Sequence, residues 1–143
     1  MEMLKNMDKF TRYCTTEQTK AALLLNAPIE SEEWNRNYPL PRYWFGDEKT
    51  MRCYHIPTME QMLGWLEQQG ILVSVHYSID ESCTVCATKG FDRIYKSDYM
   101  SRNRALLGCI DKSLEYLKAI YDMKAVSNLE KVCEKEYRNI LKL

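Results

Sequence analysis

The stretch ESCTVCATKG, residues 81–90, holds the two cysteines whose spacing most resembles a chemical site. A Cys-x-x-Cys pair binds zinc when it lies on a tight turn and further ligands complete the tetrahedron, and it does redox chemistry at the start of a helix. Here Thr84 and Val85 separate the cysteines, and β-branched residues favour an extended backbone. Because residues i and i+3 of a strand point to opposite faces, the pattern predicts that Cys83 and Cys86 form no reactive or metal-binding pair.

No residue pattern in the rest of the chain indicates a catalytic group. The other four cysteines stand singly, and His55 and His76 lie in separate predicted strands, where an isolated histidine is more often structural than catalytic. Phosphate-binding loops are rich in glycine, and the chain has only five glycines in 143 residues. No motif of a catalytic nucleophile is present either. The sequence therefore predicts no catalytic residue, no metal site and no cofactor. An enzyme whose active site is assembled from scattered residues stays the third alternative for the function.

The composition is that of one soluble globular domain. Hydrophobic residues make up 45% of the chain and charged residues 28%, and 143 residues can bury a core without disulfides. No apolar run approaches the roughly 20 residues that cross a membrane, and the N-terminus does not resemble a signal peptide. We therefore expect reduced cysteines, a location in the cytoplasm, and one domain with a core over 13–121 and a helical extension over 122–143.

Four helices are predicted, three of them from capping boxes, in which a Ser or Thr side chain and a Glu or Gln three residues later satisfy each other's backbone amides. Thr15-Thr16-Glu17-Gln18 opens one helix, Thr58-Met59-Glu60-Gln61 opens another that stops at Gly70, and Ser127-Asn128-Leu129-Glu130 opens a last one that reaches the C-terminus. A further helix over about 102–121 shows a clear apolar stripe: Leu107, Ile110, Leu114, Leu117 and Tyr121.

Strands are predicted between these helices. Residues 71–78 alternate between apolar and polar side chains, 83–88 return as a partner strand, and 91–95 and 51–56 are shorter candidates. The segment 28–50 holds three of the four prolines and is interpreted as a long ordered loop. The sequence thus predicts an α+β fold: a small antiparallel sheet, made of the hairpin 71–88 plus one or two further strands, packed by helices on one face.

The best candidate for a protein-binding surface is the aromatic run 37–45. Tyrosine, tryptophan and arginine commonly anchor interfaces, and the candidate residues are Tyr38, Arg42, Tyr43 and Trp44. The alternative is that these side chains hold the loop against the sheet.

A nucleic-acid-binding module is the second alternative. The predicted order helix–β–β–β–helix over 58–121 is that of double-stranded-RNA-binding domains, which meet phosphates with basic side chains near the start of the last helix. The basic residues in that region are Lys89, Arg93, Lys96, Arg102 and Arg104. Asp92 and Asp98 dilute this patch, and the family's Lys-rich helix start and loop histidine are absent.

The last predicted helix, 127–142, has Leu129, Val132, Cys133, Tyr137, Ile140 and Leu141 on one side. This stripe covers either the protein's own core or a second copy, so self-association through this helix is one expected partner arrangement. Charge is split along the chain, with 8 basic and 12 acidic residues over 1–88 and 12 basic and 8 acidic residues over 89–143. The split permits contact between the halves or with an anionic partner.

Three motifs resemble those of a group of small proteins from phages and prophage-like elements of gut bacteria. They are Cys-Thr-x-Glu-Gln-Thr at 14–19, Pro-Thr-x-Glu-x-Met at 57–62 and Ser-Arg-x-x-Ala-Leu at 101–106, and the resemblance covers about residues 13–121. The group has no assigned activity, so the resemblance implies a phage- or mobile-element-like origin and a location in the cytoplasm of the bacterial host, and it implies nothing about chemistry. The combined expectation is a small protein that acts by binding another macromolecule and not by catalysis.

Overall fold

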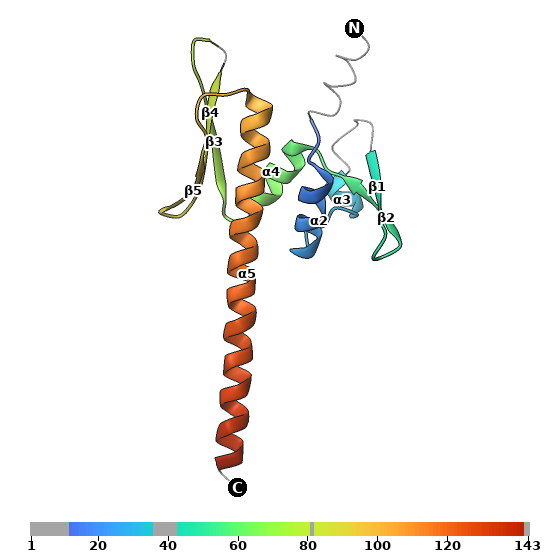
Figure 1. Cartoon of the computed structure of the whole chain (residues 1–143), viewed down its shortest axis with the longest axis vertical. Helices are drawn as coiled ribbons and strands as arrows, with labels where there is room; N and C mark the ends of the chain where they lie inside the picture. Colours follow the sequence, from blue (N-terminus) through green and yellow to red (C-terminus); the bar gives the residue numbers. More distant parts are fainter. Residues whose placement is uncertain (1–11, 36–42, 81, 142–143) are drawn as a thin grey trace.

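The computed structural model describes residues 12–35, 43–80 and 82–141, and it has an α+β fold. Figure 1 shows a compact α+β region from which one long helix projects. In chain order the elements are α2 (Thr16–Leu24), α3 (Glu32–Asn35), β1 (Tyr43–Asp47), β2 (Arg52–Ile56), α4 (Met59–Gln68), β3 (Leu72–Tyr77), β4 (Cys83–Lys89), β5 (Asp92–Lys96) and α5 (Arg102–Leu141).

The strands form two antiparallel sheets. The larger sheet has the order β3-β4-β5, with Val75 opposite Val85 and Ala87 opposite Tyr95, which confirms the predicted hairpin and its third strand. The predicted strand at 51–56 does not join this sheet, because β2 pairs with β1 in a separate hairpin. The interpretation of 28–50 as loop was therefore wrong for 43–47, where Tyr43, Trp44 and Phe45 supply side chains that suit a strand, and it was also wrong for 32–35, which form the short helix α3.

Both predicted capping boxes at the start of the shorter helices are confirmed. In α2 the Thr15 hydroxyl accepts from the backbone of Gln18, whose side chain accepts from the backbone of Thr15, and Thr58 and Gln61 repeat this arrangement in α4. Gly70 follows α4 with φ = +88°, a left-handed conformation that glycine adopts without strain. Local hydrogen bonding thus determines where these two helices begin.

The third predicted cap is wrong. Residues 102–141 form one helix of 40 residues, about 60 Å long, and Ser127 lies inside it. A capping box marks a helix start only where something ends the helix before it. The segment Asp122–Ser127 contains neither glycine nor proline, so the helix continues through it.

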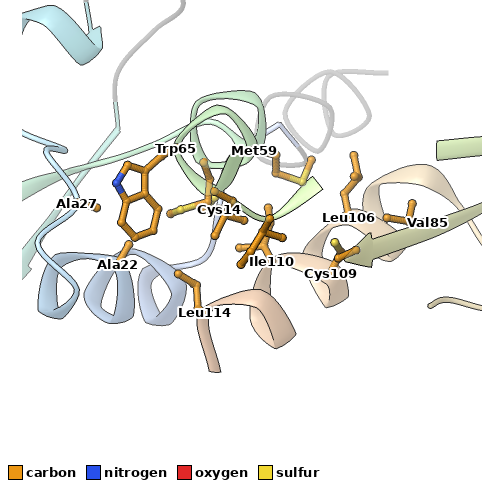
Figure 2. Packing of buried hydrophobic residues seen from close by; sticks show 14 of the residues in the cluster. Cys14, Ala22, Ala27, Met59, Trp65, Val85, Leu106, Cys109, Ile110 and Leu114 are labelled. Atoms are coloured by element: carbon orange, nitrogen blue, oxygen red, sulfur yellow. The ribbon is translucent and has the colours of Figure 1, made fainter. Parts of the chain in front are cut away.

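The hydrophobic core lies between the sheet and the helices. Figure 2 shows its members coming from α2, α4, β4 and the first third of α5. Met62, Leu66 and Ile71 are fully buried, as are Leu106 and Ile110 of α5. Helices α4 and α5 contact each other and pack against the sheet, α4 at β3 and α5 at β4 and β5, as expected for helices on one face. After Leu117 no residue of α5 belongs to the core among the described residues.

Cys83 and Cys86 lie in β4, as predicted. Burial alternates along this strand: Cys83, Val85 and Ala87 face the helices and are fully buried, whereas Cys86 is half-buried. The two sulfur atoms therefore point to opposite faces of the sheet, which confirms the geometric expectation.

Candidate functional site

A groove of about 620 Å³ lies between α2 and the middle of α5. Its floor and walls are largely apolar on the α2 side, where Ala21, Leu24 and Leu25 face it, and Leu24 is 75% exposed. The residues of α5 that line it are Gly108, Asp111, Lys112, Leu114, Glu115, Lys118, Tyr121 and Asp122, and Tyr95 of β5 completes the lining. The groove has the mixed apolar and polar lining typical of a binding site.

Gln18 lies at the end of this groove that is nearest the start of α5. Its side-chain nitrogen donates to the backbone carbonyl of Leu107 at 2.9 Å and to Asp111 Oδ1 at 2.7 Å. Its side-chain oxygen meanwhile accepts from the backbone N–H of Thr15, which is the cap of α2. One buried side chain therefore sets both the start of α2 and the position of α2 over α5.

The groove carries more negative than positive charge. Four carboxylates line it, Glu17, Asp111, Glu115 and Asp122, against the two ammonium groups of Lys112 and Lys118. An occupant with positively charged side chains at its margins therefore suits this groove.

Below the groove, α5 projects alone. Every residue from Tyr121 to Ile140, here named the α5 tail, is exposed. Large hydrophobic side chains in the tail are between 51% and 71% exposed: Tyr121, Met123, Val126, Leu129, Val132, Tyr137 and Ile140. Contiguous exposed apolar surface of this kind marks interaction sites.

The apolar residues of the tail form a stripe that is distinct from the core face of α5. A helix turns about 100° per residue, so Ile110, Leu117 and then Lys124 and Lys131, each seven residues apart, stay on nearly one face. Leu129 lies twelve residues after Leu117, about a third of a turn away. The tail stripe consists of Val126, Leu129, Val132, Cys133 and Ile140. It is therefore not a continuation of the surface that packs on the sheet.

The aromatic run predicted as a binding surface is only partly within the described residues. Tyr38 and Arg42 lie outside them. Tyr43 is half-buried and packs edge-to-face on Tyr13, with ring centroids 4.7 Å apart. Trp44 is 57% exposed and lies over the ring of His55 at a centroid distance of 3.4 Å. Both described aromatics thus make contacts within the protein, and Trp44 also presents surface to solvent.

The two histidines are not brought together. His55 of β2 is 8% exposed, and Glu30 binds it twice: one carboxylate oxygen accepts from its backbone N–H at 2.7 Å and the other lies 3.1 Å from Nδ1. Its Nε2 is buried without a hydrogen-bond partner. His76 is exposed in β3, which belongs to the other sheet. The groove between α2 and α5 contains neither histidine, so the acids that line it have no imidazole base beside them.

The five basic residues of the nucleic-acid alternative fall into separate groups. Lys89 and Arg93 lie at the β4–β5 turn, and Lys96 is opposite Cys86 in mid-strand. Arg102 and Arg104 begin α5, close to Met100, which pairs with Cys83 at the other end of β4. The length of β4 places about 20 Å between these ends. The structure therefore does not gather the predicted patch.

The six thiols are all free, and they differ in exposure. Cys53 and Cys133 are exposed, Cys86 is half-buried, and Cys14, Cys83 and Cys109 are buried. Burial raises the pKa of Cys109 to about 11 and raises the pKa of Cys14 still further. Within the described residues, no three His, Cys, Asp or Glu side chains are grouped so as to hold a metal ion. No helix in that part of the chain combines the length and apolarity needed to cross a membrane.

Sequence reasoning found the apolar side of the last helix but missed the groove above it. The sequence predicts only a capping role for Gln18, and nothing near it in the chain indicates a partner 93 positions away. The exposure of Leu24 at the end of α2, which marks the apolar side of the groove, is visible only in the structure. Comparison of the chain with protein families, curated proteins and solved structures finds no match.

Proposed function

We propose that this protein acts in the bacterial cytoplasm by binding another protein through the α5 tail, and not by catalysis. The observation that carries the proposal is the exposure of the tail stripe, which runs along about 21 Å of helix from Val126 to Ile140. Burying a Leu, Val or Ile side chain stabilises by about 1.5–3 kcal/mol, so the stripe offers a large gain to any surface that covers it.

The tail has little else to hold it helical. Isolated helices of this length are marginally stable in water, because the cost of nucleation is offset only slowly by added hydrogen bonds. Among the described residues, its ion pair is Glu134 with Arg138 at 2.8 Å, and an exposed pair of this spacing contributes only about 0.3–0.5 kcal/mol. A partner that buries the stripe supplies the missing stabilisation. An α-helix or a groove that accepts a helix fits such a stripe best.

Photo-crosslinking in cells tests this proposal. A photoreactive phenylalanine derivative is placed at Leu129, in the stripe, and separately at Lys131, which lies about 200° further around the helix. We expect covalent adducts with another polypeptide from position 129 and few or none from position 131. Equal adduct formation from both positions, or none from either, would overturn the proposal.

Nucleic-acid binding is the second candidate, supported by the order α4-β3-β4-β5-α5 with its helices packed on the sheet. Negative charges near these elements argue against nucleic-acid binding. Exposed Glu60 and Glu67 lie on α4, and hydrogen bonds from Ser78 and Ser82 lower the pKa of Asp80 in the β3–β4 turn to about 2, so that it stays negative. These groups repel phosphates.

An electrophoretic titration with duplex RNA and DNA over a salt series decides this second candidate. A binder that uses the start of α5 shows a steep salt dependence, and replacing Arg102 and Arg104 by alanine lowers the slope of log affinity against log salt by about two. The matched control replaces Lys131 and Lys135 of the tail by alanine. Absence of any shift at micromolar protein would exclude the candidate.

A further inference from the structure

We propose that the groove between α2 and α5 binds a small organic cation with an apolar body, and that the ammonium group of this ligand lies at the end of the groove nearest the start of α5. Glu17, Asp111 and Tyr95 form the polar end of the site, and Leu24 and Leu25 lie on its apolar side. This inference goes beyond the proposed function, because the groove and the tail stripe are different surfaces and neither needs the other.

The dimensions of the groove fit a small molecule better than a helix of another protein. Its volume of about 620 Å³ lies within the range of about 300–1,000 Å³ that is usual for small-molecule sites. Its lining on α5 runs from Gly108 to Asp122, which is about 21 Å of helix. The mean cross-section is therefore about 30 Å², whereas an α-helix with its side chains is about 10–12 Å wide and needs about 80–110 Å². An alkyl chain or a single aromatic ring is narrow enough to enter.

The negative charge of the groove is concentrated at one end. Among the described residues, the carboxylates of Glu17 and Asp111 make no ion pair, and the nearby ammonium group of Lys112 is already paired with a carboxylate of its own helix at 3.3 Å. At the other end of the groove the charge of Lys118 offsets that of Asp122. Two negative charges therefore stand in excess at the end nearest the start of α5, and this excess orients a cation in the groove.

The carboxylate of Asp111 is held in place before a ligand arrives. The side chain of Gln18 is 2% exposed, and its nitrogen donates to Asp111 Oδ1 at 2.7 Å. Because this donor is neutral, the contact leaves the negative charge of the carboxylate in place, and the second carboxylate oxygen remains to accept from an ammonium N–H. An acceptor that is already fixed binds a ligand at a lower entropic cost than a mobile side chain does.

Tyr95 of β5 supplies a third oxygen atom at this end of the groove. A β-carbon at position 108 would stand 2.7 Å from its hydroxyl oxygen, so the absence of a side chain at Gly108 lets this hydroxyl reach the groove. The hydroxyl makes no hydrogen bond within the part of the chain that the structure describes. Burial raises the pKa of Tyr95, so the phenol stays neutral at neutral pH and its lone pair can accept from an ammonium N–H.

The apolar body of the ligand lies along the α2 side of the groove, where Ala21, Leu24 and Leu25 face it. Leu24 is 75% exposed, and Tyr121 on the α5 side is 51% exposed, so both leave apolar surface in water that a ligand covers. Removal of this surface from water favours binding. A molecule with one positive charge at its end and hydrocarbon along its length therefore matches both parts of the groove.

An NMR titration of the full, isotope-labelled chain tests the class of ligand. The probes are octylammonium, octanoate and octanol, which share one hydrocarbon chain and differ in charge. We expect octylammonium to shift the amide signal of Gly108 saturably and to bind about tenfold or more tightly than octanoate, with octanol between them. Absence of saturable binding, octanoate binding as tight as that of octylammonium, or shifts confined to the tail stripe would each overturn the inference.

Removal of the two carboxylates tests the polar end of the site. Glu17→Gln with Asp111→Asn keeps the shape of both side chains and removes their charges, so the affinity for octylammonium should fall at least about fivefold while that for octanol changes by less than about twofold. Glu17→Gln alone, at an exposed position, should give a smaller loss in the same direction. The matched control is Glu60→Gln with Glu67→Gln, which neutralises two exposed carboxylates of α4 outside the groove. Equal losses in the double variant and this control would contradict the site.

Shortening of one leucine tests the apolar side. Leu24→Ala should weaken the binding of both octylammonium and octanol, whereas Leu129→Ala, which shortens an equally exposed leucine of the tail, should leave both affinities unchanged within about twofold. The reverse pattern would place the hydrocarbon chain on the tail stripe and not in the groove. Because the photo-crosslinking from position 129 does not involve the groove, this inference and the proposed function can fail independently of each other.

Discussion

The side chain of Gln18 donates to Asp111 Oδ1 at 2.7 Å while its oxygen accepts from the backbone of Thr15 at 3.0 Å. This residue links a local feature, the cap of α2, to a long-range one, the packing of α2 on α5. Gln18→Glu keeps the capping oxygen and removes only the donor, so it isolates the contact between the helices.

We expect Gln18→Glu to destabilise the protein by about 1–3 kcal/mol at pH 7, because it places two carboxylates in contact and removes the side-chain donor to the Leu107 carbonyl. Repulsion between like charges raises the pKa of such a pair in the folded state. The lost stability therefore returns as the pH falls and one carboxylate is protonated. Urea unfolding between pH 4 and 8 measures this, and a cost independent of pH would contradict the close contact with Asp111.

Gly108 of α5 is needed for the close approach of Tyr95. A β-carbon at position 108 would stand 2.7 Å from the Tyr95 hydroxyl oxygen and 3.3 Å from the ring carbon that carries it. Gly108→Ala improves helix propensity by about 1 kcal/mol, but overpacking costs about 1–3 kcal/mol. We expect a net loss of stability in urea or thermal unfolding.

Tyr95→Phe provides the control for this prediction, because it removes the oxygen atom that the added methyl group meets. Gly108→Ala should cost less, or become stabilising, in the Tyr95→Phe background. Equal effects of Gly108→Ala in both backgrounds would show that the hydroxyl does not limit the approach.

Thiol reactivity should separate the cysteines by burial. In the native protein at pH 8 we expect Cys53 and Cys133 to react rapidly with a maleimide or an aromatic disulfide, as exposed thiols do. Cys14 and Cys109 should react only as fast as the protein unfolds, since burial keeps them as neutral thiols with raised pKa. Peptide mass mapping after timed labelling assigns each site, and fast labelling of Cys109 would contradict its placement in the core.

The raised pKa of Cys109 should make the stability of the protein depend on alkaline pH. Because the pKa of Cys109 is raised to about 11 in the folded state from an ordinary value of 9.0, its neutral form contributes stability that is complete below pH 9. That contribution is lost as the pH rises through about 11. The free energy of unfolding of the wild type, measured in urea, should therefore fall over this pH range. That of Cys109→Ala should fall less steeply, even though this variant is less stable at neutral pH.

Removal of the tail should leave the compact region folded. The described residues that truncation after Tyr121 removes are exposed through Ile140, so we expect the free energy of unfolding, measured in urea, to change by less than about 1 kcal/mol. A large loss of stability in the monomer would mean that the tail contacts the compact region.

Much of the local structure follows from the sequence alone. The caps at Thr15 and Thr58, the alternation from Cys83 to Ala87 and the periodic stripe through Ile110 and Leu117 depend on hydrogen bonds and side-chain directions that reach only a few residues. These features predicted the α+β fold, and they placed Cys83 and Cys86 on opposite faces.

Only the tertiary structure decided the rest. The pairing of β1 with β2, the link from Gln18 to Asp111 and the groove above the tail stripe all join residues far apart in the chain. Local patterns determine which face of an element is apolar, whereas the surface that covers that face depends on the packing of the whole chain.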